Sequence, residues 1–339
     1  MRGVVYVDKG KIVVKDDLPK PDLKPGEVMV KPKYCGICGS CIESYKYGGM
    51  YLPGIIIGHE FSGDVVEVGD NVKNLKVGDR VSIDPNTPCN DCYWCNRYKE
   101  NMCKLSNNAL GTTHNGGMAE FINVRADHAH IMPDSMSYRA GATVEPLGNC
   151  LYGIQESGFK IGDNATVFGA GTIGLMTLQA LKAAGASDIF VLEPVEFKQK
   201  KALELGASEA FNPKNWNKII RITDKVGPDH IFDCVGNPDT MMTSLNLIKR
   251  GGKIILIGIH IEPFEMKGLM RIPLRNITLR GVFGFTPDIF KASLKLIAEK
   301  KVNGEAIVTN TIKIDEVPKM FQKLANPPHE EIKVLVEID

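Results

Sequence analysis

A short glycine-rich stretch, Gly169-Ala-Gly171-Thr-Ile-Gly174, constrains the fold of this sequence more than any other feature. A GxGxxG pattern alone is weak evidence, but this one follows an apolar stretch of strand character and opens an apolar helical stretch. Glycines in such a turn let the backbone approach a pyrophosphate, and the N-terminus of the following helix favours its negative charge. The pattern therefore predicts a strand–turn–helix unit that binds a dinucleotide through Gly169, Gly171, Thr172, Ile173 and Gly174.

An acidic residue, Glu193, closes the next predicted strand about twenty residues after the glycine turn, as dinucleotide-binding units require. Its carboxylate is expected to accept hydrogen bonds from ribose hydroxyls and to repel a 2′-phosphate. The segment 194–198 adds another acid and no arginine, so NAD is favoured over NADP. Lys198 is a further candidate for ribose contact, although a lysine on a solvated helix face is the ordinary interpretation.

Strand and helix patterns alternate through the second half of the chain. Strands are predicted at 188–193, 230–236 and 253–258, with a helix at 198–205. This alternation indicates βαβ units and a parallel sheet. Over residues 1–32 and 58–83, apolar and polar residues alternate between Gly-Asp and Pro-Gly turns, which is typical of short strands in a small barrel.

The predicted fold is α/β, with a length of 339 residues that suits two cores. A β-barrel domain is predicted over 1–150 and a doubly wound parallel-sheet domain over 151–285. Residues 286–339, with a helix near 288–300 and strands near 306–313 and 332–338, are predicted to return to the first domain.

Composition and charge disfavour several classes of protein. The net charge is +1 with no block of like charges, so nothing favours nucleic acid or an anionic membrane as a partner. The sequence has no apolar run long enough for a signal peptide or a membrane span. Nine cysteines, several at metal-binding spacing, favour reduced thiols over disulfides, and a cytoplasmic location is expected.

Four cysteines follow the predicted barrel strands at the spacing C-x2-C-x2-C-x7-C, namely Cys89, Cys92, Cys95 and Cys103. A closed four-cysteine zinc site is the best account, and because four sulfur ligands leave no open position it is predicted to brace the lobe 89–103. Incidental buried cysteines and an iron–sulfur cluster are weaker alternatives. A nucleic-acid-binding zinc module is disfavoured because the chain has no basic excess.

A second set of metal-ligand residue types lies in a different pattern. Cys38 and His59 flank a glycine-rich stretch, and Glu145 lies in a predicted loop over 144–150 that contains a proline. Catalytic zinc takes three protein ligands and leaves one position open. A histidine with an ordinary polar partner beside an unrelated acid, Glu60, is the alternative for the pair 59–60, but the three residues together favour a catalytic zinc site.

Several short motifs follow one another along the chain. They are Gly36-Ile-Cys38-Gly-Ser40, Gly58-His59-Glu60-x2-Gly63-x5-Gly69-x2-Val72 and Val77-Gly-Asp-Arg-Val81, followed by the four cysteines, Glu145-Pro-Leu and the glycine turn. In this order they resemble the zinc-dependent medium-chain dehydrogenases/reductases, the alcohol and polyol dehydrogenase family. The resemblance implies a GroES-like catalytic domain, a Rossmann NAD-binding domain, two zinc ions per chain and a homo-oligomer, dimeric or tetrameric.

The resemblance also implies roles for individual residues. Cys38, His59 and Glu145 would be the catalytic zinc ligands, and Glu60 a nearby carboxylate able to approach or exchange at the metal. Ser40 would pass on the substrate proton. Glutamate as the third ligand resembles the sorbitol, threonine and related polyol or sugar branches more than the simple-alcohol branch.

Two positions, 41 and 43, differ from the usual pattern of the family. The family usually has Asp directly after the residue at position 40, and this Asp holds the zinc-bound histidine. This chain has Cys41 there instead. Cys41 is interpreted as a small filler or, in some state, as a metal ligand. Two positions further on, where many members have His, this chain has Glu43, as similar glucose dehydrogenases do. Glu43 would relay the proton or bind a sugar hydroxyl, or else be a surface acid.

The sequence therefore predicts a zinc- and NAD-dependent dehydrogenase that oxidises a secondary hydroxyl of a small polyol, cyclitol or sugar to a ketone, reversibly. Threonine, short-chain diols or secondary alcohols, and aldoses oxidised at the anomeric carbon are alternative substrates. A non-catalytic nucleotide-binding scaffold is a remote alternative, because Cys41 replaces the usual acid.

Overall fold

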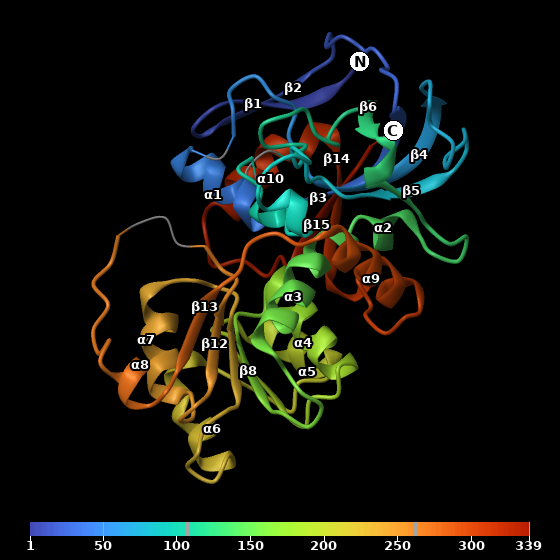
Figure 1. The fold of residues 1–339 in the computed structure, drawn as a ribbon. Helices are drawn as coiled ribbons and strands as arrows, with labels where there is room; N and C mark the ends of the chain where they lie inside the picture. The colour runs from blue at the N-terminus through green and yellow to red at the C-terminus, as the bar shows by residue number, and fades with distance from the viewer. Residues whose placement is uncertain (50, 106–108, 260–262, 339) are drawn as a thin grey trace. The chain divides into compact units, whose positions relative to one another are not determined.

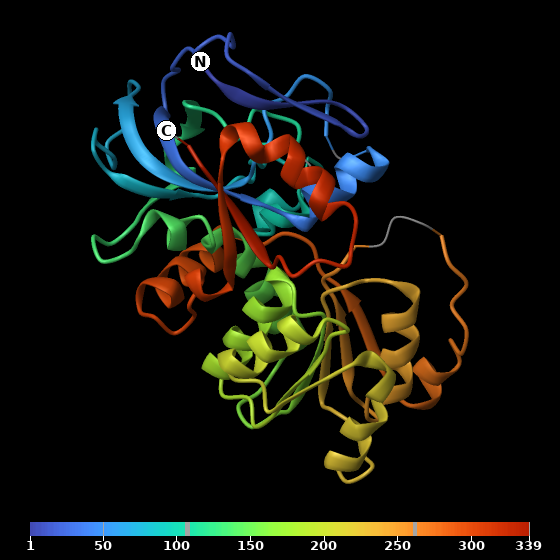
Figure 2. The same ribbon diagram turned by 180° about the vertical axis from the view of Figure 1, so that it is seen from behind.

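The computed structural model describes residues 1–49, 51–105, 109–259 and 263–338. The chain divides into two compact units, each with its own core. Unit 1 comprises Met1–Glu145 and Phe285–Asp339, and unit 2 comprises Pro146–Gly284. The last part of the sequence thus joins the first part (Figures 1 and 2).

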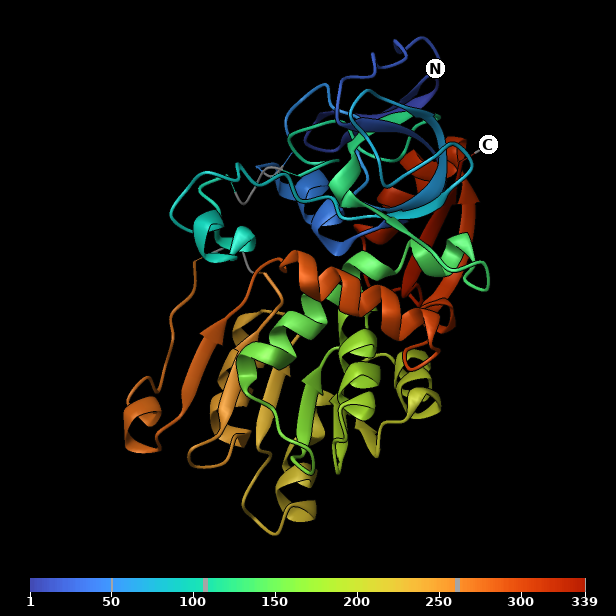
Figure 3. The ribbon, with the colours of Figure 1, turned by 45° about the vertical axis from the view of Figure 1, so that its right-hand side comes forward.

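Unit 2 is built on a six-stranded, wholly parallel sheet in the order β10-β9-β8-β11-β12-β13. This is the strand order of a dinucleotide-binding fold, whose ligands bind where the order reverses, here between β8 and β11. Figure 3 shows strands of this sheet side by side. The strands are β8 (Ala165–Phe168), β9 (Ile189–Leu192), β10 (Glu209–Phe211), β11 (His230–Asp233), β12 (Lys253–Leu256) and β13 (Thr278–Gly281).

Helices cover the parallel sheet, with α4 on one side of its strands and α7 on the other (Figures 1 and 2). Phe168, Phe190 and Ile231 are fully or almost fully buried in the core. The helices are α3 (Val144–Ser157), α4 (Thr172–Ala183), α5 (Glu196–Leu205), α6 (Asn217–Ile222), α7 (Pro238–Leu247) and α8 (Arg271–Leu274), with a 3₁₀ turn at Pro213–Asn215.

The prediction of a loop at 144–150 is wrong, because this segment is the beginning of helix α3. Pro146 lies in the first helical turn, where the missing backbone N–H would have had no helical partner. The proline is therefore compatible with a helix start.

Unit 1 contains a seven-stranded sheet in the order β14-β15-β3-β4-β5-β7, with β6 also paired to β3, and a separate β1–β2 hairpin. Its pairs are antiparallel except β14 with β15. The strands are β1 (Gly3–Asp8), β2 (Lys11–Lys15), β3 (Glu27–Ile37), β4 (Glu60–Val68), β5 (Arg80–Ile83), β6 (Ile122–Arg125), β7 (Ala129–Ile131), β14 (Val308–Lys313) and β15 (Lys333–Glu337).

The remaining helices of unit 1 are short, apart from α9. They are α1 (Gly39–Tyr47), α2 (Tyr138–Gly141), α9 (Pro287–Ala298) and α10 (Val317–Leu324), with 3₁₀ turns at Cys95–Arg97, Glu100–Met102, Ala126–His128, Glu305–Ile307 and Ile314–Glu316. The predicted fold class, a GroES-like domain with a parallel-sheet Rossmann domain, is confirmed.

Strand β15 begins with the lysine of a buried ion pair. It pairs with β3 from Val334 opposite Ile37 onward. The ammonium group of Lys333 donates hydrogen bonds to the Glu60 carboxylate (2.5 Å) and to the Ile37 carbonyl (3.1 Å), and both charged side chains are fully buried. Removing one partner from such a pair leaves an uncompensated buried charge.

Lys333→Met is therefore expected to lower the free energy of unfolding by roughly 3–5 kcal/mol, measured by urea denaturation. The double variant Glu60→Gln/Lys333→Met is expected to recover most of the loss, because neither side chain is then charged. Lys313→Met is the control, since its pair with Glu337 joins the neighbouring strands but is exposed and worth at most about 1 kcal/mol. Equal losses in Lys333→Met and the control would contradict the buried-pair account.

Candidate metal and cofactor sites

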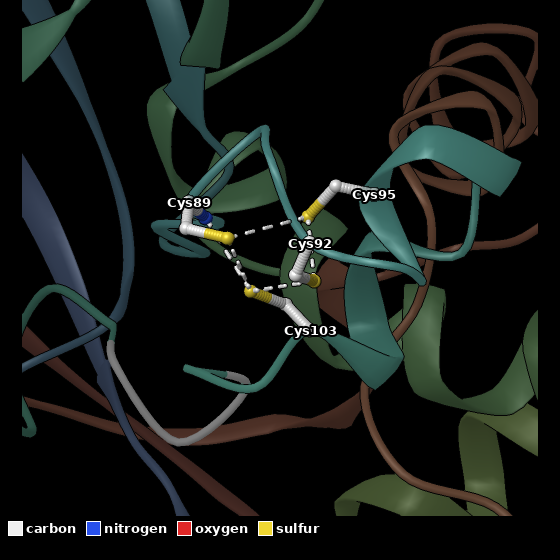
Figure 4. Close-up of side chains that lie close together, drawn as sticks. All are labelled: Cys89, Cys92, Cys95 and Cys103. Carbon is white, nitrogen blue, oxygen red and sulfur yellow. Dashed lines mark hydrogen bonds between the residues drawn. The ribbon is translucent and has the colours of Figure 1, made fainter.

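The four-cysteine lobe brings its sulfur atoms into a compact group (Figure 4). The Sγ–Sγ distances are 3.5 Å for Cys89–Cys103, 3.6 Å for Cys92–Cys95, 3.8 Å for Cys92–Cys103 and 4.0 Å for Cys89–Cys95. Four sulfurs at the zinc–sulfur bond length around one ion would be about 3.8 Å apart. The group therefore has the dimensions of a tetrahedral zinc site.

Backbone N–H groups point at the lobe sulfurs, as metal-binding thiolates need. The amides of Cys89 and Leu105 donate to the Cys103 sulfur at 3.4 and 3.3 Å. Backbone donors, first that of Cys95 and then that of Lys104, lower the pKa of Cys92 to about 6. Burial instead raises the pKa of Cys95 to about 12, so a bound cation is what would make all four sulfurs thiolates together.

A second group of ligand atoms lies where β3 leads into α1 and where β4 begins. One atom each from Cys38, His59 and Glu60 lies within 4.8 Å of the others. Cys38 is the extended residue just before helix α1, and Glu60 is the first residue of β4. Gly36 lies opposite Glu60, and a Cβ there would come within 2.0 Å of the Glu60 carboxylate, so glycine is required.

The Glu60 carboxylate has two different environments. Its Oε2 is held by Lys333, whereas its buried Oε1 has no hydrogen-bond partner among the residues that the structure describes. Burial lowers the pKa of Lys333, but the negative charges of Glu60, Cys38 and, more weakly, Glu145 outweigh burial and raise this pKa. The orphaned oxygen and this concentration of anionic groups fit a bound cation.

Glu145 lies in the first turn of α3 and is buried, but it is not in the group of three atoms within 4.8 Å. Ser40 and Glu43 lie on α1 and are half-buried. Cys41, on the same helix, is fully buried with its Sγ 4.0 Å from Nδ1 of His59.

The His59 ring lies close to the sulfur atoms of Cys38 and Cys41. Burial lowers the pKa of His59, but the sulfurs of Cys41 and Cys38 outweigh burial and raise it well above its ordinary value. Nearby, burial raises the pKa of Tyr51, and the Cys41 thiol raises it further. The surroundings of His59 are thus sulfur-rich, and the sulfur of Cys41 is part of them.

The glycine turn has the geometry that a dinucleotide-binding turn needs. Gly169 has φ +86°, and a Cβ on Gly174 would lie 1.9 Å from the Gly169 carbonyl oxygen. A Cβ on Gly171 would meet nothing within 4 Å, so the backbone before α4 is open to a ligand. Thr172 and Ile173 form the first turn of α4.

Glu193 is held rigidly beside this turn. Its carboxylate accepts hydrogen bonds from the backbone N–H groups of Ala170 (2.7 Å) and Val195 (2.9 Å), and the side chain is buried. Lys198 lies half-buried on α5. The structure thus places Glu193 beside the turn. Each of its carboxylate oxygens can accept a second hydrogen bond, which a ligand could donate.

Sequence reasoning missed Lys333 and Tyr51. A single lysine directly before Val334-Leu335-Val336 in a predicted strand was the signal for a buried partner, because lysine is almost never fully buried unless paired. Tyr51 gave no comparable signal, since neither its spacing nor its neighbours distinguish it.

Comparisons with known proteins agree with this arrangement. A family described as zinc-binding dehydrogenase matches residues 172–299, and the alcohol dehydrogenase GroES-like domain matches residues 24–134. The (R,R)-butanediol dehydrogenase of Bacillus subtilis is 34% identical over 316 residues, which cover 89% of this chain and 90% of that protein. The sorbitol dehydrogenase of the same organism is 28% identical over 346 residues, 99% and 97% of the two chains.

Among solved structures, a Sinorhizobium meliloti protein classed as a zinc-binding dehydrogenase and bound to NADP superposes with a TM-score of 0.91. It is 30% identical, and the match covers 99% of this chain and 98% of that one. These matches show an oxidoreductase of a kind that uses zinc and a nicotinamide cofactor. The chain belongs to the zinc-binding dehydrogenase family, of the kind that has an alcohol dehydrogenase GroES-like domain. In the part of the chain that the structure describes, no helix is both long and apolar enough to cross a bilayer.

Gly174→Ala is expected to destabilise unit 2 by about 1–3 kcal/mol, because its Cβ would overlap the Gly169 carbonyl oxygen and force the turn apart. The temperature of thermal unfolding and the affinity for the nicotinamide cofactor are both expected to fall. Gly171→Ala is the matched control: its Cβ meets no protein atom, so stability is retained while a cofactor that approaches the turn binds more weakly. If both variants bind the cofactor like the parent, the turn is not the pyrophosphate site.

Proposed function

We propose that the protein is a zinc- and NAD-dependent dehydrogenase that oxidises a secondary hydroxyl of a polyol, cyclitol or sugar to the ketone. The observation that carries this proposal is the group of Cys38, His59 and Glu60 ligand atoms in the same chain as the glycine turn before α4. The butanediol and sorbitol dehydrogenase relatives support oxidation of secondary alcohols.

The catalytic metal would be held by Cys38, His59 and Glu145. A thiolate and a carboxylate balance the two positive charges of a zinc ion, whereas the charge of Glu60 is already balanced by Lys333. Glu60 therefore serves as a nearby carboxylate whose unpartnered Oε1 can approach the metal when its coordination changes. Because Lys333 holds the other carboxylate oxygen, Oε2, Glu60 would keep its ion pair during such an approach.

A bound zinc supplies Lewis acidity at the substrate hydroxyl. The chain's own residues do the remaining work. The hydroxyl of Ser40, on the first turn of α1, takes up the substrate proton and passes it towards Glu43 or water. Glu43 also offers a carboxylate for a neighbouring hydroxyl of a polyol or sugar. The turn at Gly169–Gly174 fixes the cofactor that accepts the hydride.

A second zinc is proposed for the four-cysteine lobe, with Cys89, Cys92, Cys95 and Cys103 as ligands. The near-tetrahedral sulfur spacing and the backbone donors around it support this assignment. Four sulfurs leave no position for a substrate, so this ion would brace the loop between β5 and β6.

NAD is the proposed cofactor on account of Glu193. Two backbone N–H groups hold its carboxylate in place, so a 2′-phosphate that arrived beside it would face a fixed negative charge. The Sinorhizobium meliloti relative is bound to NADP, and we attribute the preference for NAD in this chain to Glu193. Lys198 on α5 is a secondary ribose contact.

A short vicinal diol is a second candidate substrate. The observation that favours it is the identity to (R,R)-butanediol dehydrogenase, 34% against 28% for sorbitol dehydrogenase. Threonine and aldoses also stay as alternatives because specificity depends on loops rather than on the fold. The free state of all nine cysteines supports a cytoplasmic enzyme, and a homo-oligomer is proposed from the family resemblance.

The test of the proposal is zinc content per chain together with NAD-dependent oxidation of polyols, sugars, threonine, butanediols and simple alcohols. Two zinc ions and turnover on one polyol or sugar class are expected. Cys38→Ser should lose one zinc and at least a hundredfold in kcat/KM, since it removes an anionic ligand. Cys92→Ser should lose the other zinc and lower thermal stability without being needed for chemistry. A single zinc that depends on Cys92 and no turnover on any substrate would favour the scaffold alternative.

Glu193→Gln is expected to reduce the ratio of kcat/KM for NAD over NADP by roughly tenfold or more, because it removes like-charge repulsion but keeps one hydrogen-bond acceptor. Glu196→Gln is the matched control, since that acid lies on the exposed start of α5 and pairs with Lys200. An unaltered ratio in Glu193→Gln would show that cofactor choice does not depend on this carboxylate.

A further inference from the structure

The sulfur of Cys41 lies directly against the candidate metal ligand His59. Its Sγ is 4.0 Å from Nδ1 of His59, and its side chain is completely buried on α1. Cys41 is not among the three residues whose ligand atoms lie within 4.8 Å of one another. Its sulfur thus contacts the histidine ring from outside that group.

A buried tyrosine, Tyr51, lies near this sulfur. Tyr51 is 5% exposed, and its hydroxyl has no hydrogen-bond partner among the described residues. Its ring packs edge-on against Tyr6, with 5.4 Å between the ring centroids, and the thiol of Cys41 is one of its polar neighbours. A buried hydroxyl of this kind needs a partner, because an unpaired one costs about 1–3 kcal/mol.

A histidine that binds a metal through one ring nitrogen carries its hydrogen on the other, and the acceptor of that hydrogen sets the tautomer and the ring orientation. With Cys41 beside Nδ1, the nitrogen left for the metal is Nε2. The sulfur has two lone pairs, so it can accept from the ring and from a hydroxyl together.

We propose, on the basis of the function proposed above, that Cys41 is the positioning residue of His59, accepting a hydrogen bond from Nδ1–H, and that the Tyr51 hydroxyl donates to the same sulfur. The arrangement His59–Cys41–Tyr51 fixes the ring for metal binding through Nε2. Because a thiol sulfur is a weaker acceptor than a carboxylate, the catalytic metal is held less tightly than a carboxylate at position 41 would hold it.

The test is the affinity of the catalytic site for Zn²⁺, measured by chelator competition on the full chain with the four-cysteine lobe loaded. Cys41→Asp is expected to tighten Zn²⁺ binding by roughly ten- to a hundredfold, and Cys41→Ala to weaken it by a similar factor. Tyr51→Phe is expected to weaken it by a smaller factor, since it removes only the outer hydrogen bond.

Cys35→Ala is the matched control, because Cys35 is equally buried but its thiol donates to the Gly36 carbonyl rather than contacting His59. Cys41→Ser provides a second, nearly isosteric variant in case Cys41→Ala or Cys41→Asp fails to fold. It keeps an acceptor and is expected to bind Zn²⁺ more tightly than Cys41→Ala.

Cobalt substitution separates a positioning role from direct ligation. With Co²⁺ at the catalytic site, the thiolate-to-cobalt absorption band reports the number of sulfur ligands. Its intensity is expected to be unchanged in Cys41→Ser and lost in Cys38→Ser. A halved band in Cys41→Ser would make Cys41 a ligand and overturn the proposal.

Unchanged Zn²⁺ affinity in Cys41→Ala, Cys41→Ser and Cys41→Asp would also overturn it, leaving Cys41 a packing residue. A failure of the proposed function would give a different result. If the proposed zinc site is wrong, His59→Ala and Cys38→Ser will bind Zn²⁺ like the parent.

Discussion

The buried pair of Lys333 and Glu60 is the interaction on which the candidate metal site depends. It joins the strand β15 to the first residue of β4, next to His59, and it also ties Lys333 to the Ile37 carbonyl, next to Cys38. The positions of both candidate ligands are therefore linked to one ammonium group. A buried pair is weak evidence of stability in itself, but loss of one partner is severe. What the pair adds here is fixed geometry beside the metal ligands.

The same pair sets the charge at the site. Cys38, Glu60 and Glu145 bring three anionic groups into the neighbourhood of Lys333, and the ammonium group neutralises one of them. The thiolate of Cys38 and the carboxylate of Glu145 would then balance the charge of a divalent cation held with His59. The four-cysteine lobe has the opposite character, because all its ligands are local, all are sulfur and no position is left open. The four-cysteine site would thus stabilise a loop, whereas the site at Cys38 and His59 would bind a metal that contacts the substrate.

Local features of this fold could be predicted from the sequence, and long-range ones could not. The glycine turn and the four cysteines are encoded within 6 and 15 consecutive positions, so their spacing alone predicts the turn and the sulfur cluster. Pro146 was misleading, because a proline is compatible with both a loop and the first turn of a helix. The partnership of Lys333 with Glu60 spans 273 positions, and it depends on how distant strands pair. The roles of Ser40, Glu43 and Glu145 in chemistry stay predictions.

The division of unit 1 into two segments has a consequence for how the protein is made. Pro146–Gly284 is continuous, so unit 2 has all its residues once that segment has left the ribosome. Unit 1 must wait for β15, because Glu60 would otherwise be a buried charge with no cation. Until then β3 lacks the strand that pairs with it from Tyr34 to Ile37, and an unpaired strand edge can pair with other chains. The candidate ligands Cys38 and His59 are therefore synthesised long before the lysine that balances the neighbouring Glu60.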